Sequence, residues 1–179
     1  MELSRWIVLI CLLPPTIIII FDTSHMLKVG NTAPAFIATT SSGEIVRLSS
    51  YRGIRNVVLF FYPKDFTAGC AKEVCDFRDN SNELLKMNAV VFGISGDNGH
   101  SHREFKSSLK LPFELLSDAD GSIRRSYQVQ WLFGVLPWTK RITYVIDSVG
   151  VIRSVIHHEF AVAQHIEDVK TTLQGFERE

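Results

Sequence analysis

The chain has 179 residues, of which 46% are hydrophobic and 21% are charged, so it can bury the core of one ordinary domain and is not a disordered segment. Nineteen lysines and arginines balance nineteen aspartates and glutamates. This zero formal charge argues against a nucleic-acid-binding protein, which needs a basic surface for phosphates. Three cysteines are too few for a small secreted domain held together by disulfides.

Residues 1–25 contain an uncharged apolar run, Trp6–Phe21, which we treat apart from the fold. As a helix its sixteen residues would span about 24 Å, less than the ~30 Å of a bilayer core, and Pro14-Pro15 would kink it. Three interpretations stay open: a targeting or anchor segment, an apolar tail, or an upstream extension of a protein that starts at Met26. A start at Met26 predicts a cytoplasmic protein, and otherwise the segment predicts a targeted or membrane-associated one.

Residues 26–179 alternate between short β-branched runs and helical stretches, which predicts one domain of the α/β class. A hairpin is expected first, because Phe36–Thr39 and Glu44–Leu48 flank a turn of two serines and a glycine. The continuous apolar run that follows Asn56 is typical of a strand covered on both faces. Apolar residues then recur at helical spacing and predict one long helix from about Gly69 to Met87.

The second half of the domain is predicted to add four strands and three helices. In chain order they are strand Ala89–Ser95, helix His100–Leu109, strand Phe113–Ser117, short helix Ser122–Tyr127, strands Arg141–Asp147 and Val151–Ile156 as a hairpin, and helix Ala161–Phe176. We therefore expect a central mixed sheet with helices on both faces and an N-terminal hairpin. The apolar loop Gln130–Thr139, with Trp131, Phe133 and Trp138, is a candidate contact surface.

Cys70 is the clearest candidate for a reactive residue in this sequence. It is predicted to lie in the first turn of the helix that follows the buried strand. The unpaired N–H groups and the positive dipole end of a helix favour a thiolate over a thiol there. Thr67, on the preceding loop, can place a hydroxyl near the sulfur, and a nearby cation would favour the thiolate further.

Cys75 follows five residues later. In an intact helix this spacing places the two Cα atoms roughly 8–9 Å apart, whereas a disulfide needs about 4.4–6.8 Å. The pair can therefore bond only after the first turn unwinds, which suits a cycle in which Cys70 is oxidised before Cys75 reaches it. The alternative is that both cysteines are inert residues of a buried helix face.

The sequence around Cys70 favours the redox pair over two inert cysteines. The pattern P-x-x-x-T-x-x-C that ends at Cys70 resembles that of the peroxiredoxins, and the run YPKDFTAGCAKEVCDFRD is similar to the bacterioferritin comigratory protein or peroxiredoxin Q subgroup. The similarity extends over nearly all of residues 27–175 and includes the segments Val29–Phe36, Leu132–Pro137 and Arg141–Asp147. One departure is Ala68, where the family usually has proline.

The resemblance implies a thioredoxin-like fold and a thiol-dependent peroxidase. Cys70 would be the peroxidatic nucleophile, and Thr67 would hydrogen-bond the thiolate and the peroxide. Pro63 would shield the site from water. Arg141, which alone would be interpreted as a solvated charge at a strand end, would activate the thiolate and stabilise charge on the departing oxygen.

The resemblance also implies how the cycle closes. Cys75 would be the resolving cysteine, and an intramolecular Cys70–Cys75 disulfide would be reduced by thioredoxin or a similar dithiol. Glu73 would support the site in a polar network with an arginine. The substrates would be hydrogen peroxide and alkyl hydroperoxides, with no metal, haem or flavin cofactor, in a monomer.

Two other functions are considered. The first is a thiol switch or holdase, whose cysteine pair senses oxidant without turnover. The second is a thioredoxin-type disulfide oxidoreductase, against which the missing Cys-x-x-Cys motif argues.

Other polar signals are interpreted as structural. His157, His158 and Glu159 are expected at the surface, because adjacent strand residues point to opposite faces. His100 and His102 are expected to be solvated, with no cysteine or carboxylate at ligand spacing. Asp118–Gly121 is expected to be a turn, because the later ligands of a calcium loop are missing.

Overall fold

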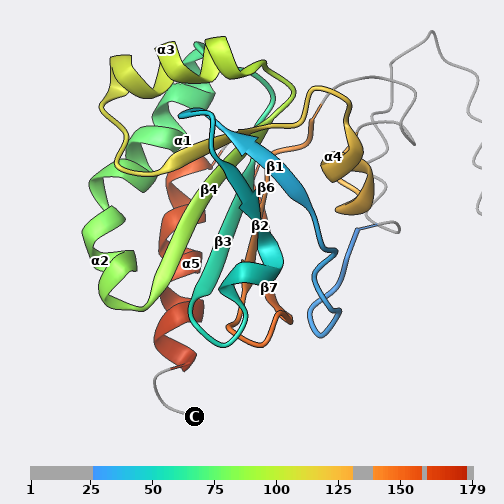
Figure 1. Cartoon of the computed structure of the whole chain (residues 1–179). Helices are drawn as coiled ribbons and strands as arrows, with labels where there is room; N and C mark the ends of the chain where they lie inside the picture. The colour runs from blue at the N-terminus through green and yellow to red at the C-terminus, as the bar shows by residue number, and fades with distance from the viewer. Residues whose placement is uncertain (1–25, 131–138, 159–160, 177–179) are drawn as a thin grey trace, which may run out of the picture.

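A mixed sheet runs through the centre of the computed structural model, which describes residues 26–130, 139–158 and 161–176 (Figure 1). Within these residues the sheet has seven strands in the order β2-β1-β5-β4-β3-β6-β7. The strands are β1 Ile37–Thr40, β2 Ile45–Arg47, β3 Asn56–Phe61, β4 Ala89–Ser95, β5 Glu114–Ser117, β6 Ile142–Ile146 and β7 Ile152–His157. The neighbours β3, β4 and β5 are parallel, and the other pairings are antiparallel.

Helices cover both faces of this sheet. They are the 3-10 helix η1 Leu48–Tyr51 and the α-helices α1 Ala68–Asp79, α2 Ser81–Lys86, α3 Gly99–Leu109, α4 Ser122–Ser126 and α5 Val162–Phe176. Apolar residues of α1, α2, α3 and α5 pack on one face, and those of η1 and α4 pack on the other. The α/β prediction, the two hairpins and the mixed sheet are confirmed.

Strand β3 is the centre of the core. All six of its residues are buried, and the five after Asn56 alternate between the two apolar clusters: Val58 and Phe60 face α1 and α5, while Val57, Leu59 and Phe61 face α4. A strand covered on both faces needs apolar side chains at every position. The uninterrupted run after Asn56 therefore predicted this position correctly.

The predicted long helix is wrong at one point, because the structure divides it into α1 and α2 at Asn80. The Asn80 side-chain amide donates to the carbonyl of Asp76 at 2.8 Å, and the Ser81 hydroxyl donates to that of Arg78 at 2.7 Å. Asn and Ser side chains compete with helical backbone bonds in this way. The apolar spacing continues through the break and so concealed it.

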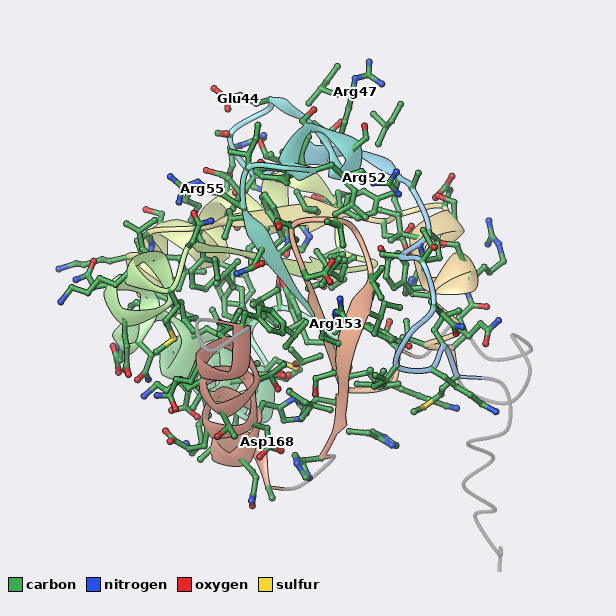
Figure 2. The ribbon with its side chains drawn as sticks, turned by 90° about the horizontal axis from the view of Figure 1, so that it is seen from below. Glu44, Arg47, Arg52, Arg55, Arg153 and Asp168 are labelled. Carbon is green, nitrogen blue, oxygen red and sulfur yellow. The ribbon has the colours of Figure 1, made fainter. Side chains whose placement is uncertain are left out.

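The surface of the described part of the chain is rich in charged residues. Charged side chains project outwards, among them Arg47 and Arg52 around β2 and Asp168 on α5 (Figure 2). Within residues 26–130, 139–158 and 161–176, no helix is long and apolar enough to cross a membrane. The predictions for residues 1–25, for Trp131, Phe133 and Trp138, and for Glu159 fall outside the described residues.

Candidate active site

Cys70 lies where β3 gives way to α1. The strand ends at Phe61, a loop over residues 62–67 follows, and α1 begins at Ala68 with Thr67 as its N-cap. Cys70 is therefore in the first turn, as predicted, where the backbone N–H groups of the helix are unpaired. Its side chain is only 1% exposed and packs into the core cluster of α1 and α5.

Arg141 reaches this sulfur from a distant part of the chain. Strand β6 is antiparallel to β3 and pairs Ile142 with Phe61, so the residue before Ile142 lies beside the carboxyl end of β3. One amino group of Arg141, Nη2, donates to Cys70 Sγ at 3.6 Å. Gly69 makes room for this approach, because a Cβ there would lie 3.3 Å from Nη2.

Glu73 holds the other side of the Arg141 guanidinium. It lies three residues after Cys70 on α1, which places both side chains on the same side of the helix. Its carboxylate is fully buried and forms an ion pair with Nη1 of Arg141. Burial alone would lower the pKa of Arg141, but its electrostatic interactions and hydrogen bonds with Glu73 and Cys70 outweigh burial and raise this pKa above its usual value. The guanidinium is thus a permanent cation beside the thiol.

His165 extends this polar chain into α5 and was not found from the sequence. Its Nδ1 lies 3.9 Å from Oε1 of Glu73 and 2.8 Å from Oγ1 of Thr143, and its Nε2 lies 3.0 Å from the carbonyl of His158. Burial lowers the pKa of His165 to about 4, so the imidazole is neutral at neutral pH. A signal was present, because His165 shares a helical stripe with the buried Val169 and Leu173.

Thr67 and Pro63, the other two predicted site residues of the loop, precede Cys70. The hydroxyl of Thr67 is exposed and donates to the carbonyl of Lys64 at 3.1 Å. Pro63 is half-buried. Their roles toward a thiolate or a peroxide stay predictions.

Cys75 is half-buried further along the same continuous helix. Both Cys70 and Cys75 are free thiols, and they lie five positions apart in an intact α-helix. This is the geometry from which a disulfide requires unwinding. The resolving role of Cys75 stays a prediction.

The expectation that His102 is solvated is wrong. Its side chain is fully buried, and its Nδ1 lies 2.9 Å from Oδ2 of Asp65 in the loop before α1. His102, Phe105 and Leu109 follow one face of α3, a spacing that indicates a packed face. His100, by contrast, has a side chain that is 72% exposed.

The other polar signals have structural partners. Asp118 accepts from the backbone N–H groups of Ile123 and Arg124, and so closes the predicted turn before α4. His158 pairs with Asp168 of α5 at 2.8 Å. In the part of the chain that the structure describes, no group of three His, Cys, Asp or Glu residues could hold a metal ion.

The site therefore joins a thiol at a helix start, a buried guanidinium on its sulfur and a carboxylate that orients the guanidinium. Such an arrangement can stabilise a thiolate and then the negative charge that develops on the departing oxygen when the thiolate attacks a peroxide.

The comparisons with known proteins agree with this chemistry. The model of the AhpC/TSA family matches residues 29–155.

Two curated relatives illustrate the similarity. Peroxiredoxin Q, chloroplastic, from Oryza sativa subsp. japonica is 44% identical over 147 residues, which are 82% of this chain and 66% of the relative, so this chain spans slightly less than two thirds of its length. Peroxiredoxin Q, chloroplastic, from Sedum lineare is 42% identical over 82% of this chain and 77% of its own.

Solved structures agree with these relatives. Peroxidoxin BcpB from Mycobacterium tuberculosis superposes with a TM-score of 0.78 at 37% identity, over 84% of this chain and 98% of that one. The bacterioferritin comigratory protein of Xanthomonas campestris is described for its alkyl peroxide reduction activity. It superposes with a TM-score of 0.72 at 28% identity, over 79% of this chain and 91% of that one. The thioredoxin-like fold is confirmed. The chain belongs to the AhpC/TSA family and, within it, to the peroxiredoxin Q group.

Proposed function

We propose that the protein is a thiol-dependent peroxidase that reduces hydrogen peroxide and alkyl hydroperoxides. The observation that carries the proposal is the contact of 3.6 Å between the buried guanidinium of Arg141 and the sulfur of Cys70 in the first turn of α1. Both the cation and the helix start favour a thiolate, which is the nucleophilic form.

In the first step the Cys70 thiolate attacks one peroxide oxygen. An S–O bond forms, the O–O bond breaks, and two electrons pass from sulfur to the departing oxygen, which takes a proton and leaves as water or an alcohol. The positive charge of Arg141 would stabilise the charge that moves onto that oxygen. Cys70 becomes a sulfenic acid. Thr67 and Pro63 would bind the peroxide and exclude water.

In the second step the first turn of α1 unwinds and the thiol of Cys75 attacks the sulfenic sulfur. A disulfide forms and one water molecule leaves. A dithiol reductant such as thioredoxin would then transfer two electrons, restore both thiols and become a disulfide itself. The helical geometry supports this order, because Cys75 cannot reach Cys70 while α1 is whole.

Relatives support the same chemistry. The group name peroxiredoxin Q and the alkyl peroxide reduction activity ascribed to the Xanthomonas campestris protein are consistent with a peroxide substrate here. The thioredoxin partner and a monomeric state are part of the proposal.

Steady-state consumption of hydrogen peroxide with thioredoxin, its reductase and NADPH tests the proposal. We expect many turnovers from the wild type and none from Cys70→Ser, which removes the nucleophile. A single stoichiometric oxidation without turnover would instead identify a thiol switch. Insulin reduction is expected to be absent.

The division of the chain is also proposed. Residues 26–179 would form the peroxidase domain, and residues 1–25 would be a separate segment. Mass spectrometry of the native N-terminus decides between a start near Met26 and a longer or processed chain. The curated relatives named above are chloroplastic.

A further inference from the structure

The loop between β3 and α1 is tied to the start of α3 by a buried polar cluster that the proposed chemistry does not use. We call Tyr62, Asp65, Ser101 and His102 the Asp65 clamp. The Tyr62 hydroxyl donates to Oδ1 of Asp65 at 2.7 Å. The Ser101 hydroxyl donates to Oδ2 at 2.7 Å, and Nδ1 of His102 lies 2.9 Å from the same oxygen. Because an ionised carboxylate only accepts, His102 donates from Nδ1.

The protonation of Asp65 and Tyr62 suits the hydrogen bonds of the clamp. Burial raises the pKa of Asp65, but hydrogen bonds from His102, Ser101 and Tyr62 outweigh it and hold this pKa below its usual value. Burial and the Asp65 charge raise the pKa of Tyr62 well above its usual value. Asp65 therefore stays an ionised acceptor at neutral pH, and Tyr62 stays a donor.

The α3 side of the clamp is itself fixed. The Asn98 side chain caps α3 by accepting from the backbone N–H groups of His100 and Ser101. Asp97, just before it, accepts from the backbone N–H of Asp65 at 2.9 Å and from the Ser95 hydroxyl at 2.7 Å. The carboxyl end of β4 and the first turn of α3 thus hold both the side chain and the backbone of Asp65. Figure 1 shows α3 at the end of the molecule where α1 starts.

Phe66, the residue after Asp65, has a strained backbone conformation that the clamp can stabilise. Phe66 has φ 59°, in the left-handed region that bulky residues seldom adopt, and the residue is 57% exposed. The ring lies 4.9 Å from that of Phe105 on α3. Thr67, the N-cap of α1, follows directly. A loop pinned in this conformation fixes where α1 begins.

A purely stabilising role explains the clamp poorly. Nε2 of His102 is buried and has no hydrogen-bond partner in the described part of the chain. An orphaned buried nitrogen costs free energy that an apolar residue of similar size would not. The cluster is thus better explained by the geometry that it imposes on the loop.

We infer that Asp65 and His102 are positioning residues that keep the first turn of α1 folded, and Cys70 beside Arg141, until a peroxide has reacted. This inference rests on the proposed function. Loosening the clamp should favour the unwound turn, in which Cys70 loses the Arg141 contact but reaches Cys75 more easily. The two chemical steps should therefore respond in opposite directions.

Amide hydrogen exchange of the reduced protein tests the structural half without any turnover. In His102→Leu we expect the amides of residues 71–74, whose N–H groups bond to the carbonyls of the first turn, to exchange at least tenfold faster than in the wild type, with β3 and β4 unchanged. His102→Asn, whose amide N–H replaces the Nδ1 donor, should restore most of the protection. His100→Leu is the matched control, because His100 lies on the exposed side of the same helix.

Single-turnover kinetics and mass spectrometry test the chemical half. His102→Leu should slow sulfenic acid formation at least tenfold, yet require several times more peroxide to convert half of Cys70 to sulfinic acid, because the disulfide forms sooner. Lower thermal stability alone would not produce this split. If His102→Leu does not fold, Asp65→Asn, which keeps the shape and removes the charge, carries the same expectations.

The outcomes separate the two proposals. A wild type without peroxide turnover would overturn the proposed function, whatever the exchange data show. A wild type with turnover, and folded variants whose exchange and peroxide steps match it, would overturn the clamp. Equal slowing in His100→Leu and His102→Leu would also count against it.

Discussion

At the scale of single residues, the two amino groups of the Arg141 guanidinium have different partners in the site. Nη1 pairs with Glu73 and Nη2 contacts Cys70, so one buried cation lies against both a carboxylate and a sulfur. A buried charge is tolerated only when it is paired. Glu73 therefore makes it possible to keep a guanidinium in the core, and orients it so that its second amino group faces the sulfur.

We expect Arg141→Ala to slow sulfenic acid formation about 100-fold, the usual loss when one preorganised charge donor is removed from a reacting centre. The thiol should also need a more alkaline solution to react with iodoacetamide. Stopped-flow kinetics and the pH profile of alkylation measure both effects. Arg141→Lys should recover only part of the rate, because lysine lacks the planar fork.

The matched control is Arg153→Ala, since Arg153 is half-exposed and pairs with Asp147 on the surface of β7. This variant should behave as the wild type. An unchanged pH profile in Arg141→Ala would contradict the assigned role.

Sequence patterns identified some of these residues and not others. Cys70 was singled out by its predicted place at a helix start and Arg141 only by the family resemblance, and the structure brings them into contact. Asp65 and His165 were not identified, and His102 was wrongly placed in solvent. The helical spacing of the two histidines indicated a packed face, but nothing local indicated that Asp65, 37 positions before His102, would be its partner. Only the packing of separate elements supplies that partner.

At the scale of elements, the proposed cycle requires α1 to be a stable helix whose first turn can unwind. Its first turn holds Cys70, while Val74 and Phe77 further along are fully buried against the sheet. Helix ends fray at far lower cost than packed middles. Unwinding limited to the first turn is therefore the least costly route that brings the two sulfurs together.

For Cys75→Ser we expect the first oxidation to proceed at the wild-type rate, because Cys75 does not contact Cys70 in intact α1. The reaction should then stop after one equivalent of peroxide, with Cys70 as a sulfenic acid that excess peroxide converts to sulfinic acid. Trapping with a sulfenic-acid reagent and intact-mass measurement follow both products. Full thioredoxin-dependent turnover would show that another thiol resolves Cys70.

Elements were predicted well where one rule decided them. The hairpins and the doubly covered β3 follow from turn residues and apolar runs. The division between α1 and α2 did not, because two side-chain bonds from Asn80 and Ser81 override an apolar spacing that continues past them.

At the scale of the whole molecule, α5 closes the fold over the site. Ile166, Val169 and Leu173 pack against the core that contains Cys70, and His165 enters the polar chain beside Glu73. The last helix of the domain thus buries a titratable group whose folded pKa is about 4, against 6.5 for the free side chain. Burial is the main cause, and the neighbouring charges of His158, Arg141 and His157 add to it, against a hydrogen bond to the His158 carbonyl.

This depressed pKa makes stability depend on pH in a known direction. Below about pH 6.5 the unfolded chain binds a proton at His165 that the folded protein does not bind until the pH approaches 4. The free energy of unfolding therefore falls as the pH drops through this window, and His165 has no effect above it. Its share amounts to about 2 kcal/mol between pH 7.5 and pH 5.

Urea unfolding of the wild type and His165→Gln at these two pH values measures that share. Glutamine cannot titrate, so the variant should lose about 2 kcal/mol less than the wild type on acidification, even if it is less stable at both pH values. Other groups, such as Asp65, contribute equally to both proteins and cancel in the difference. His100→Gln, at an exposed histidine, should keep the wild-type dependence. If His165→Gln kept it as well, the imidazole would not be buried uncharged, and α5 would not close over the site in the way that the contacts with Thr143 and Glu73 require.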